Sequence, residues 1–122
     1  PLIARTGYAA SKHALHGLFE SLRTEVAADG VDVLLVCPSF IATRIDRNAL
    51  GATGGAAAHA QVVVGQPLDA RDVAEQIFAA CERSRRLLLI GRTARAAWWL
   101  SRFAPALYER IMARRLRAEM QP

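Results

Sequence analysis

A tyrosine and a lysine four residues apart, Tyr8 and Lys12, are the pair in this sequence best suited to proton transfer. On a helix, this spacing puts both side chains on one face, one turn apart. A free phenol, with a pKa of about 10, is a slow proton donor at neutral pH. A neighbouring ammonium group favours the ionised phenol. The pair could therefore exchange a proton with an alcohol or a carbonyl oxygen.

The basic partner of this tyrosine is also unusual for the chain, because Lys12 is its only lysine among 16 Lys and Arg residues. Lysine presents a compact ammonium with three rotatable donors, whereas the guanidinium of arginine is a wide planar fork. An ammonium can hold sugar hydroxyls while it still faces the phenol. Since this spacing is common in proteins, a surface pair without a function is the alternative on spacing alone.

The elements that must position the pair are a helix and a buried strand. Apolar residues recur at helical spacing from Tyr8 to Val26, and Gly30 can adopt the left-handed conformation that ends a helix. On this helix, Arg23 is expected on the exposed side. The apolar run at 31–38 predicts a strand that is buried on both sides and ends at Pro38.

A second helix and strand are predicted further along the chain. Asp69 is a good N-cap for a helix over 69–84, whose apolar stripe includes Cys81, and a short buried strand is expected over 86–91. The glycine- and alanine-rich segment 39–67 is interpreted as a mobile active-site loop with one short helix near 46–50. The tail, 92–122, predicts two helices that are broken near Pro105.

The alternation of helices and strands predicts an α/β fold with a parallel sheet. Two strands are too few for a self-sufficient sheet, so further strands are expected before Pro1. Ligands of such sheets bind outside the carboxyl ends of the strands. Tyr8 and Lys12 are therefore expected beside the loop that follows the first strand, Pro38 to Arg44.

The stretch GYAASKHALHGLFESLRTEVAADGVDVLLVCPSFIATR, residues 7–44, resembles the active-site helix and following strand of the short-chain dehydrogenase/reductase family. The likeness includes the YxxxK pair, and 69–84 and 87–90 are similar to the next elements of the family. The resemblance thus covers roughly 1–91. It implies the C-terminal portion of a Rossmann-like doubly wound parallel sheet, followed by a helical tail at 92–122.

This resemblance implies an NAD(P)-dependent oxidoreductase that acts on an alcohol or a ketone. Tyr8 would be the catalytic proton donor or acceptor and would also contact the cofactor. Lys12 would bind the nicotinamide ribose and take part in catalysis by favouring the ionised phenol. Residues of the following loop would hold the nicotinamide side of the cofactor, namely Pro38, Ser39, Ile41 and Thr43. The choice between NAD and NADP stays open, because the residues that discriminate them in this family lie upstream of this stretch.

The same resemblance predicts what the chain lacks. The catalytic serine and the glycine-rich cofactor loop of the family would precede Pro1, and Ser11 is expected to be a small packing residue, not that serine. The family also has Pro-Gly where this chain has Pro38 and Ser39. The chain is therefore expected to be a fragment that is inactive alone.

The charge of +5 falls in the tail, because 1–91 carry nine basic and nine acidic residues while 92–122 carry seven arginines and two glutamates. Such a tail is attracted to acidic surfaces. Its aromatic residues suit packing on the domain or a second subunit, or contact with a membrane surface. The alternative function is a non-catalytic module in which this tail binds a membrane or a partner. No nucleic-acid partner is expected.

The remaining polar residues predict no metal site. Cys37 and Cys81 fit neither a CxxC nor a zinc spacing, which suggests buried thiols in a reducing compartment, and the three histidines have no metal-ligand spacing. No signal peptide or membrane-spanning run is recognisable. We therefore expect a cytoplasmic protein, peripheral to a membrane if the tail makes contact with one. Its partners are expected to be a small, hydrophobic alcohol or ketone and, in the full-length protein, further copies of itself.

Overall fold

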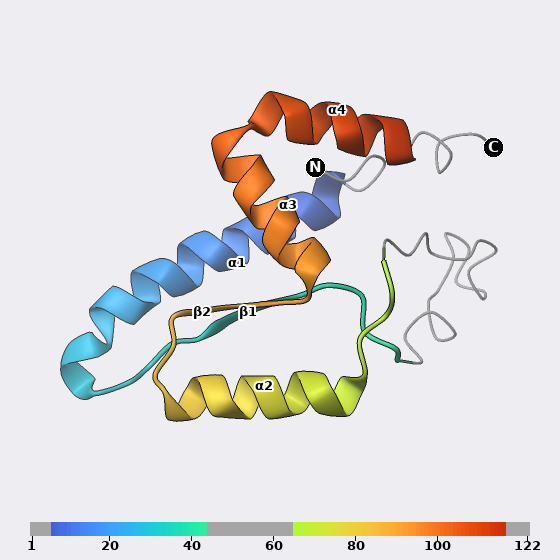
Figure 1. The fold of residues 1–122 in the computed structure, drawn as a ribbon. Helices are drawn as coiled ribbons and strands as arrows, with labels where there is room; N and C mark the ends of the chain where they lie inside the picture. Colours follow the sequence, from blue (N-terminus) through green and yellow to red (C-terminus); the bar gives the residue numbers. More distant parts are fainter. Residues whose placement is uncertain (1–5, 44–64, 117–122) are drawn as a thin grey trace, which may run out of the picture.

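The computed structural model describes residues 6–43 and 65–116 of the 122-residue chain (Figure 1). Four helices, one short 3-10 turn and two strands follow one another in these residues. Their order is α1 (Thr6–Glu25), η1 (Ala27–Asp29), β1 (Leu35–Pro38), α2 (Ala70–Glu82), β2 (Leu87–Ile90), α3 (Arg92–Phe103) and α4 (Pro105–Leu116). The predicted α/β class is therefore confirmed. The short helix expected near 46–50 falls outside the described residues.

The sheet consists of β1 and β2, which pair in parallel from Leu35 opposite Leu87 to Pro38 opposite Ile90. Figure 1 shows α1 and α2 on opposite sides of these strands, as in one part of a doubly wound sheet. The first strand begins at Leu35, four residues later than the sequence predicts. The cause is that β2 begins only at Leu87, after a turn in which Ser84 has a φ of 48°.

Helix α1 ends as the sequence predicts, by a left-handed glycine, although through a tighter last turn. The α-helical part stops at Glu25, and the single 3-10 turn η1 follows it. Gly30 has a φ of 72° and donates its N–H to the carbonyl oxygen of Ala27 at 3.2 Å. A residue without a Cβ adopts this conformation at no steric cost, so Gly30 releases the chain toward β1.

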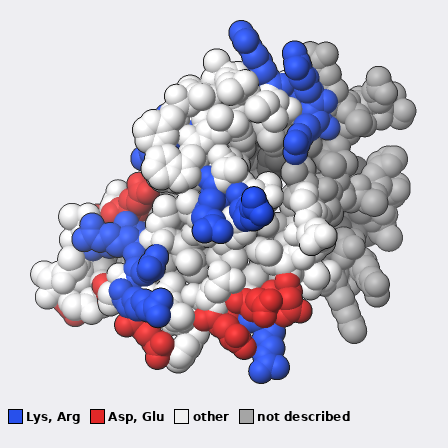
Figure 2. All heavy atoms as spheres, in the orientation of Figure 1, with Lys and Arg blue, Asp and Glu red and all other residues white. Residues whose placement is uncertain are grey.

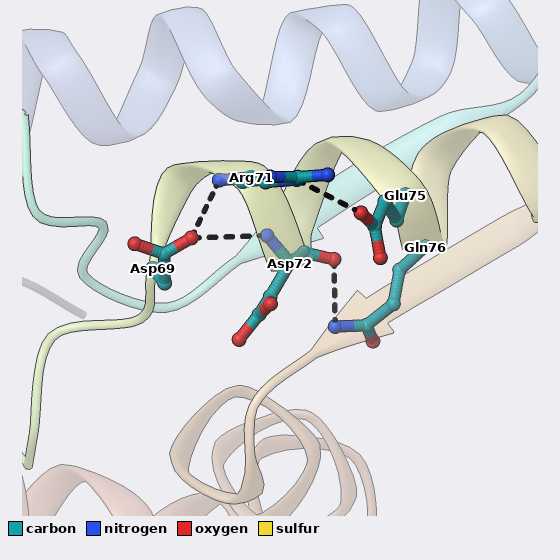
Figure 3. A network of polar contacts seen from close by, with 5 residues as sticks. All are labelled: Asp69, Arg71, Asp72, Glu75 and Gln76. Atoms are coloured by element: carbon teal, nitrogen blue, oxygen red, sulfur yellow. Dashed lines mark hydrogen bonds and ion pairs between the residues drawn. The ribbon is translucent and has the colours of Figure 1, made fainter.

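Helix α2 begins at the predicted N-cap (Figure 3). The carboxylate of Asp69 accepts hydrogen bonds from the backbone N–H groups of Arg71 at 2.8 Å and Asp72 at 3.2 Å. The guanidinium of Arg71 then contacts Glu75 at 3.2 Å, and the amide of Gln76 donates to the carbonyl of Asp72 at 3.2 Å. The N-cap thus satisfies two N–H groups that have no partner inside the helix.

The core of the described residues lies between α2 and β2. Val73, Ala80 and Ile90 are the buried apolar residues, and Ile90 is only 1% exposed. Cys81 was expected on the buried stripe but is exposed. A helix turns by about 100° per residue, so the neighbour of a central core residue such as Ala80 can already face solvent.

The tail forms two helices with a break at Ala104 and Pro105, as predicted. Pro105 is the first residue of α4, a position where its missing N–H costs no helical hydrogen bond. Helix α3 contacts both β2 and α4. None of the helices in the described ranges is long and apolar enough to cross a membrane.

Candidate active site

The tyrosine and the lysine lie on one face of the first turns of α1. The Lys12 ammonium nitrogen is 5.4 Å from the centroid of the Tyr8 ring, and Tyr8 is 55% exposed. The two polar groups can therefore reach a single ligand. Ser11, which the sequence suggests is a packing residue, is exposed instead, and its hydroxyl donates to the backbone carbonyl of Tyr8 at 2.7 Å.

Two anchors fix α1 antiparallel to the strands. At one end, Arg23 donates to the carbonyl oxygens of Val33 and Arg86, both at 2.9 Å, just before β1 and β2 begin. Nearer the other end, Nε2 of His16 lies 3.6 Å from Sγ of Cys37 in β1. Arg23 is thus half-buried, and the prediction that it faces solvent is wrong, because its guanidinium turns toward these two carbonyls.

This orientation carries the start of α1 past the carboxyl ends of the strands. Tyr8 precedes His16 by eight residues, which is about 12 Å along a helix at 1.5 Å per residue. Figure 1 shows the start of α1, in dark blue, on the side toward which both strands run. Tyr8 and Lys12 therefore lie at the edge of the sheet where the sequence predicts them.

The loop after β1 begins at this same edge and is held to β2. The N–H of Ser39 donates to the carbonyl of Ile90 at 3.0 Å. Gly91, with a φ of 94°, brings its backbone so close that an added Cβ would lie 2.8 Å from the Ser39 hydroxyl oxygen. Of the two residues expected to contact a cofactor at this point, Pro38 is exposed and Ser39 is half-buried, so only Ser39 is partly covered.

Further along the loop, Ile41 forms an isolated parallel bridge with Leu68. The two hydrogen bonds of this bridge use the carbonyl of Phe40, at 2.8 Å, and the N–H of Ala42, at 2.9 Å. The N–H and C=O of Ile41 itself take part in neither bond. Its backbone can therefore serve a ligand, while Thr43 is exposed at the end of the described segment.

Three residues that hold the site together, or hold the helix that carries it, were not predicted in these roles. Gly91 closes the junction with Ser39, Arg23 sets the direction of α1, and His16 contacts Cys37. A glycine directly after a buried strand is a usable sequence signal for a close backbone approach. The partners of Arg23 and His16 leave no such local signal.

The thiol of Cys37 is a poor nucleophile in this setting. Burial raises its pKa, because a thiolate is less well solvated inside the protein. Nδ1 of His16 lies 3.9 Å from a carboxylate oxygen of Glu20, so the ring is held between the two groups. We therefore assign Cys37 and His16 to the packing of α1 on β1.

A cavity of about 640 Å³ lies at the opposite end of α1. Residues of α1, of the turn into β1 and of the turn before β2 line it, among them Glu20, Arg23, Gly30 and Arg86. It is open at the amino ends of the strands, whereas Tyr8 lies beyond their carboxyl ends. This cavity is therefore not part of the candidate site.

Comparison with known proteins gives a consistent set of relatives. Residues 1–54 match the family model described as short chain dehydrogenase. The chain is 37% identical over 112 residues to a "Dehydrogenase/reductase SDR family protein 7-like" of Anopheles gambiae, covering 91% of this chain and 35% of that protein.

Vertebrate relatives match over a similar length. The chain is 33% identical over 116 residues to "Dehydrogenase/reductase SDR family member 7B" of Danio rerio, covering 94% of this chain and 38% of that protein. The rat protein of the same name is 34% identical over 116 residues, covering 94% and 36%. The chain thus spans about a third of the length of these relatives. No solved structure matches it significantly.

Proposed function

Because this chain belongs to the short-chain dehydrogenase/reductase family, we propose that it supplies the acid–base residues of an NAD(P)-dependent oxidoreductase. The proposed substrate is a small alcohol or ketone. The observation that carries this proposal is the exposed Tyr8–Lys12 pair, with the ammonium 5.4 Å from the ring centroid, at the carboxyl edge of a parallel sheet.

In the proposed reaction, Tyr8 handles the proton. Its hydroxyl donates a proton to the oxygen of a ketone in reduction, and in oxidation its phenolate oxygen accepts the proton of an alcohol. The cofactor, when bound, supplies or accepts the hydride.

The residues at the edge fit a nicotinamide nucleotide. The Lys12 ammonium offers donors to the hydroxyl oxygens of a ribose and lies on the same face as the phenol. The backbone N–H and C=O of Ile41, which the bridge with Leu68 leaves unused, suit the donor and acceptor groups of a carboxamide. Pro38, Ser39 and Thr43 are proposed to line the same side.

The two tyrosines of the chain provide a matched test in the full-length gene product. We expect Tyr8→Phe to lower NAD(P)H-linked turnover at least about 100-fold, the usual contribution of a general acid or base. Tyr108→Phe on α4 should leave turnover unchanged, although Tyr108 is the more buried of the two. Far-UV circular dichroism checks that both variants fold.

Cofactor binding separates the role of Lys12 from that of Tyr8. Titration with NAD(P)H should show weaker binding for Lys12→Ala and nearly unchanged binding for Tyr8→Phe. The proposal is wrong if Tyr8→Phe keeps full turnover, or if Lys12→Ala changes neither binding nor turnover.

A further inference from the structure

One face of α3 combines exposed aromatic rings with arginines, and we call it the aromatic–arginine face. It consists of Arg92, Arg95, Trp99, Arg102 and Phe103. These positions recur every three or four residues, so they lie on one side of the helix. All five side chains are exposed, with Trp99 at 57% and Phe103 at 72%. The other side of α3 carries the half-buried Leu100 and contacts β2 and α4.

The rings of this face pack on one another instead of entering the core. Trp99 and Phe103 stack with centroids 5.0 Å apart and ring planes 20° from parallel. Trp98 meets Trp99 edge-on at 5.3 Å, and the guanidinium of Arg102 lies 5.1 Å from the centroid of Trp98. The result is an ordered apolar patch with the positive charge of Arg102 beside it. The rings stay exposed to water, although their burial would be favourable in free energy.

The charge around this patch is one-sided. Residues 92–116 hold six arginines and a single acidic residue, Glu109, and α3 holds no acidic residue at all. Figure 2 shows basic side chains over the region where Figure 1 draws α3 and α4, while acidic side chains on this face gather lower, around α1 and α2. The tail therefore attracts an anionic surface.

We propose that the aromatic–arginine face of α3 docks on the surface of an anionic lipid bilayer. Tryptophan and phenylalanine rings are stable at the level of the lipid headgroups, and arginines extend from an apolar surface to lipid phosphates. Positive charge adjacent to the patch adds electrostatic attraction to anionic lipids. This docking goes beyond the proposed oxidoreductase chemistry and does not depend on it.

Two other occupants suit the face less well. A second copy of the same face would bring the arginines of both chains together, which opposes association through like charges. Single-stranded nucleic acid binds by stacking bases on aromatic faces, but Trp99 and Phe103 each cover one face of the other. Insertion into a bilayer does not require a free ring face for stacking, and the anionic lipid headgroups neutralise the positive charge of the arginines.

The test is the binding of the whole 122-residue chain to vesicles of phosphatidylcholine, with and without 30% phosphatidylserine. We expect co-sedimentation that depends on phosphatidylserine and weakens with salt, and a blue shift of tryptophan fluorescence with quenching by brominated lipid. Replacing Arg92, Arg95 and Arg102 by glutamine should lower partitioning by about 100-fold, since each basic residue near the surface contributes about fivefold. Trp99→Ser with Phe103→Ser should remove binding and leave the helical content unchanged.

Matched controls elsewhere on the surface make the result specific. Phe78→Ser removes a ring that is 66% exposed on α2, and glutamine at Arg71, Arg83 and Arg85 removes the same number of positive charges. Both controls should still bind. The proposal is overturned by equal binding to neutral vesicles, by equal losses in the controls, or by no binding at all. It is also overturned if the Trp99 and Phe103 variant loses only self-association or RNA binding.

Discussion

Arg23 and Val33 are joined by a hydrogen bond in which Nε of the guanidinium donates to the backbone carbonyl at 2.9 Å. The same guanidinium reaches the carbonyl of Arg86, 63 positions away in the chain, also at 2.9 Å. One side chain on α1 therefore holds the approaches to both strands. Because α1 is a continuous helix, this clamp also sets the direction in which Tyr8 and Lys12 are presented.

Removal of this clamp should destabilise the fold. We expect Arg23→Leu to lower the free energy of unfolding by about 1–2 kcal/mol, since two carbonyls lose a charged donor in a partly solvated setting. Urea denaturation followed by circular dichroism measures the change. Arg83→Leu, at an exposed arginine after α2, serves as the control and should stay within about 0.5 kcal/mol of the parent. Equal effects of the two substitutions would contradict the role of Arg23.

The N-cap of α2 is the second point of predicted sensitivity. Asp69→Ala removes the acceptor for two backbone N–H groups and should cost about 1 kcal/mol of unfolding free energy. Asp69→Asn should restore most of the loss, because an amide oxygen can accept the same bonds. Glu75→Ala breaks only an exposed pair with Arg71 and should cost no more than about 0.5 kcal/mol. A larger loss for Glu75→Ala than for Asp69→Ala would refute the N-cap prediction.

Two glycines should respond to alanine in opposite ways. Gly91→Ala places a Cβ 2.8 Å from the Ser39 hydroxyl at a φ of 94°, so a loss of at least about 1 kcal/mol is expected. Gly17 lies inside α1 with nothing within 4 Å of an added Cβ, and Gly17→Ala should gain about 0.5–1 kcal/mol. Thermal or urea unfolding distinguishes the two. Stabilisation by Gly91→Ala would show that the junction with Ser39 is loose.

The two cysteines should react with iodoacetamide at different rates. Cys81 is exposed, whereas Cys37 is partly covered and burial raises its pKa, so less thiolate is present at a given pH. Mass spectrometry of a time course at pH 8 should find Cys81 alkylated first. The rate at Cys37 should keep rising with pH above the usual thiol range, until its own raised pKa is passed. Faster reaction at Cys37 would refute the packing role assigned to it.

Local signals predicted most of the elements. The N-cap at Asp69, the left-handed Gly30 and the break at Pro105 each depend on the chemistry of one or two residues, and each is confirmed. The start of β1 at Leu35 was missed, because a strand begins where a partner begins and the sequence does not show that partner. The exposure of Cys81 was not predicted for a similar reason. An apolar stripe on a helix does not show how much of that stripe the neighbouring strand will bury.

The candidate site divides in the same way. The relation of Tyr8 to Lys12 is a helical spacing, and the edge at which they lie follows from a helix that returns to a parallel strand. The contacts of Gly91 with Ser39 and of Arg23 with Arg86 join segments far apart in the sequence. Such contacts depend on how the elements pack together. Gly91 after a buried strand signals a close backbone approach, but no pattern along the chain reports which segment it meets.

Leu35 and Leu87 pair in parallel, so the chain between the two strands must return to the end at which the first strand began. The length of that connection can change without altering the pairing. The entropy cost of closing a flexible connection grows slowly, by only about 0.6 kcal/mol for each doubling of its length. A connection that leaves one strand and returns beside it can therefore gain or lose residues at little cost, provided that α2 and the clamp at Arg23 are kept. Related proteins can thus differ in the length of this connection while Tyr8 and Lys12 keep their places on α1.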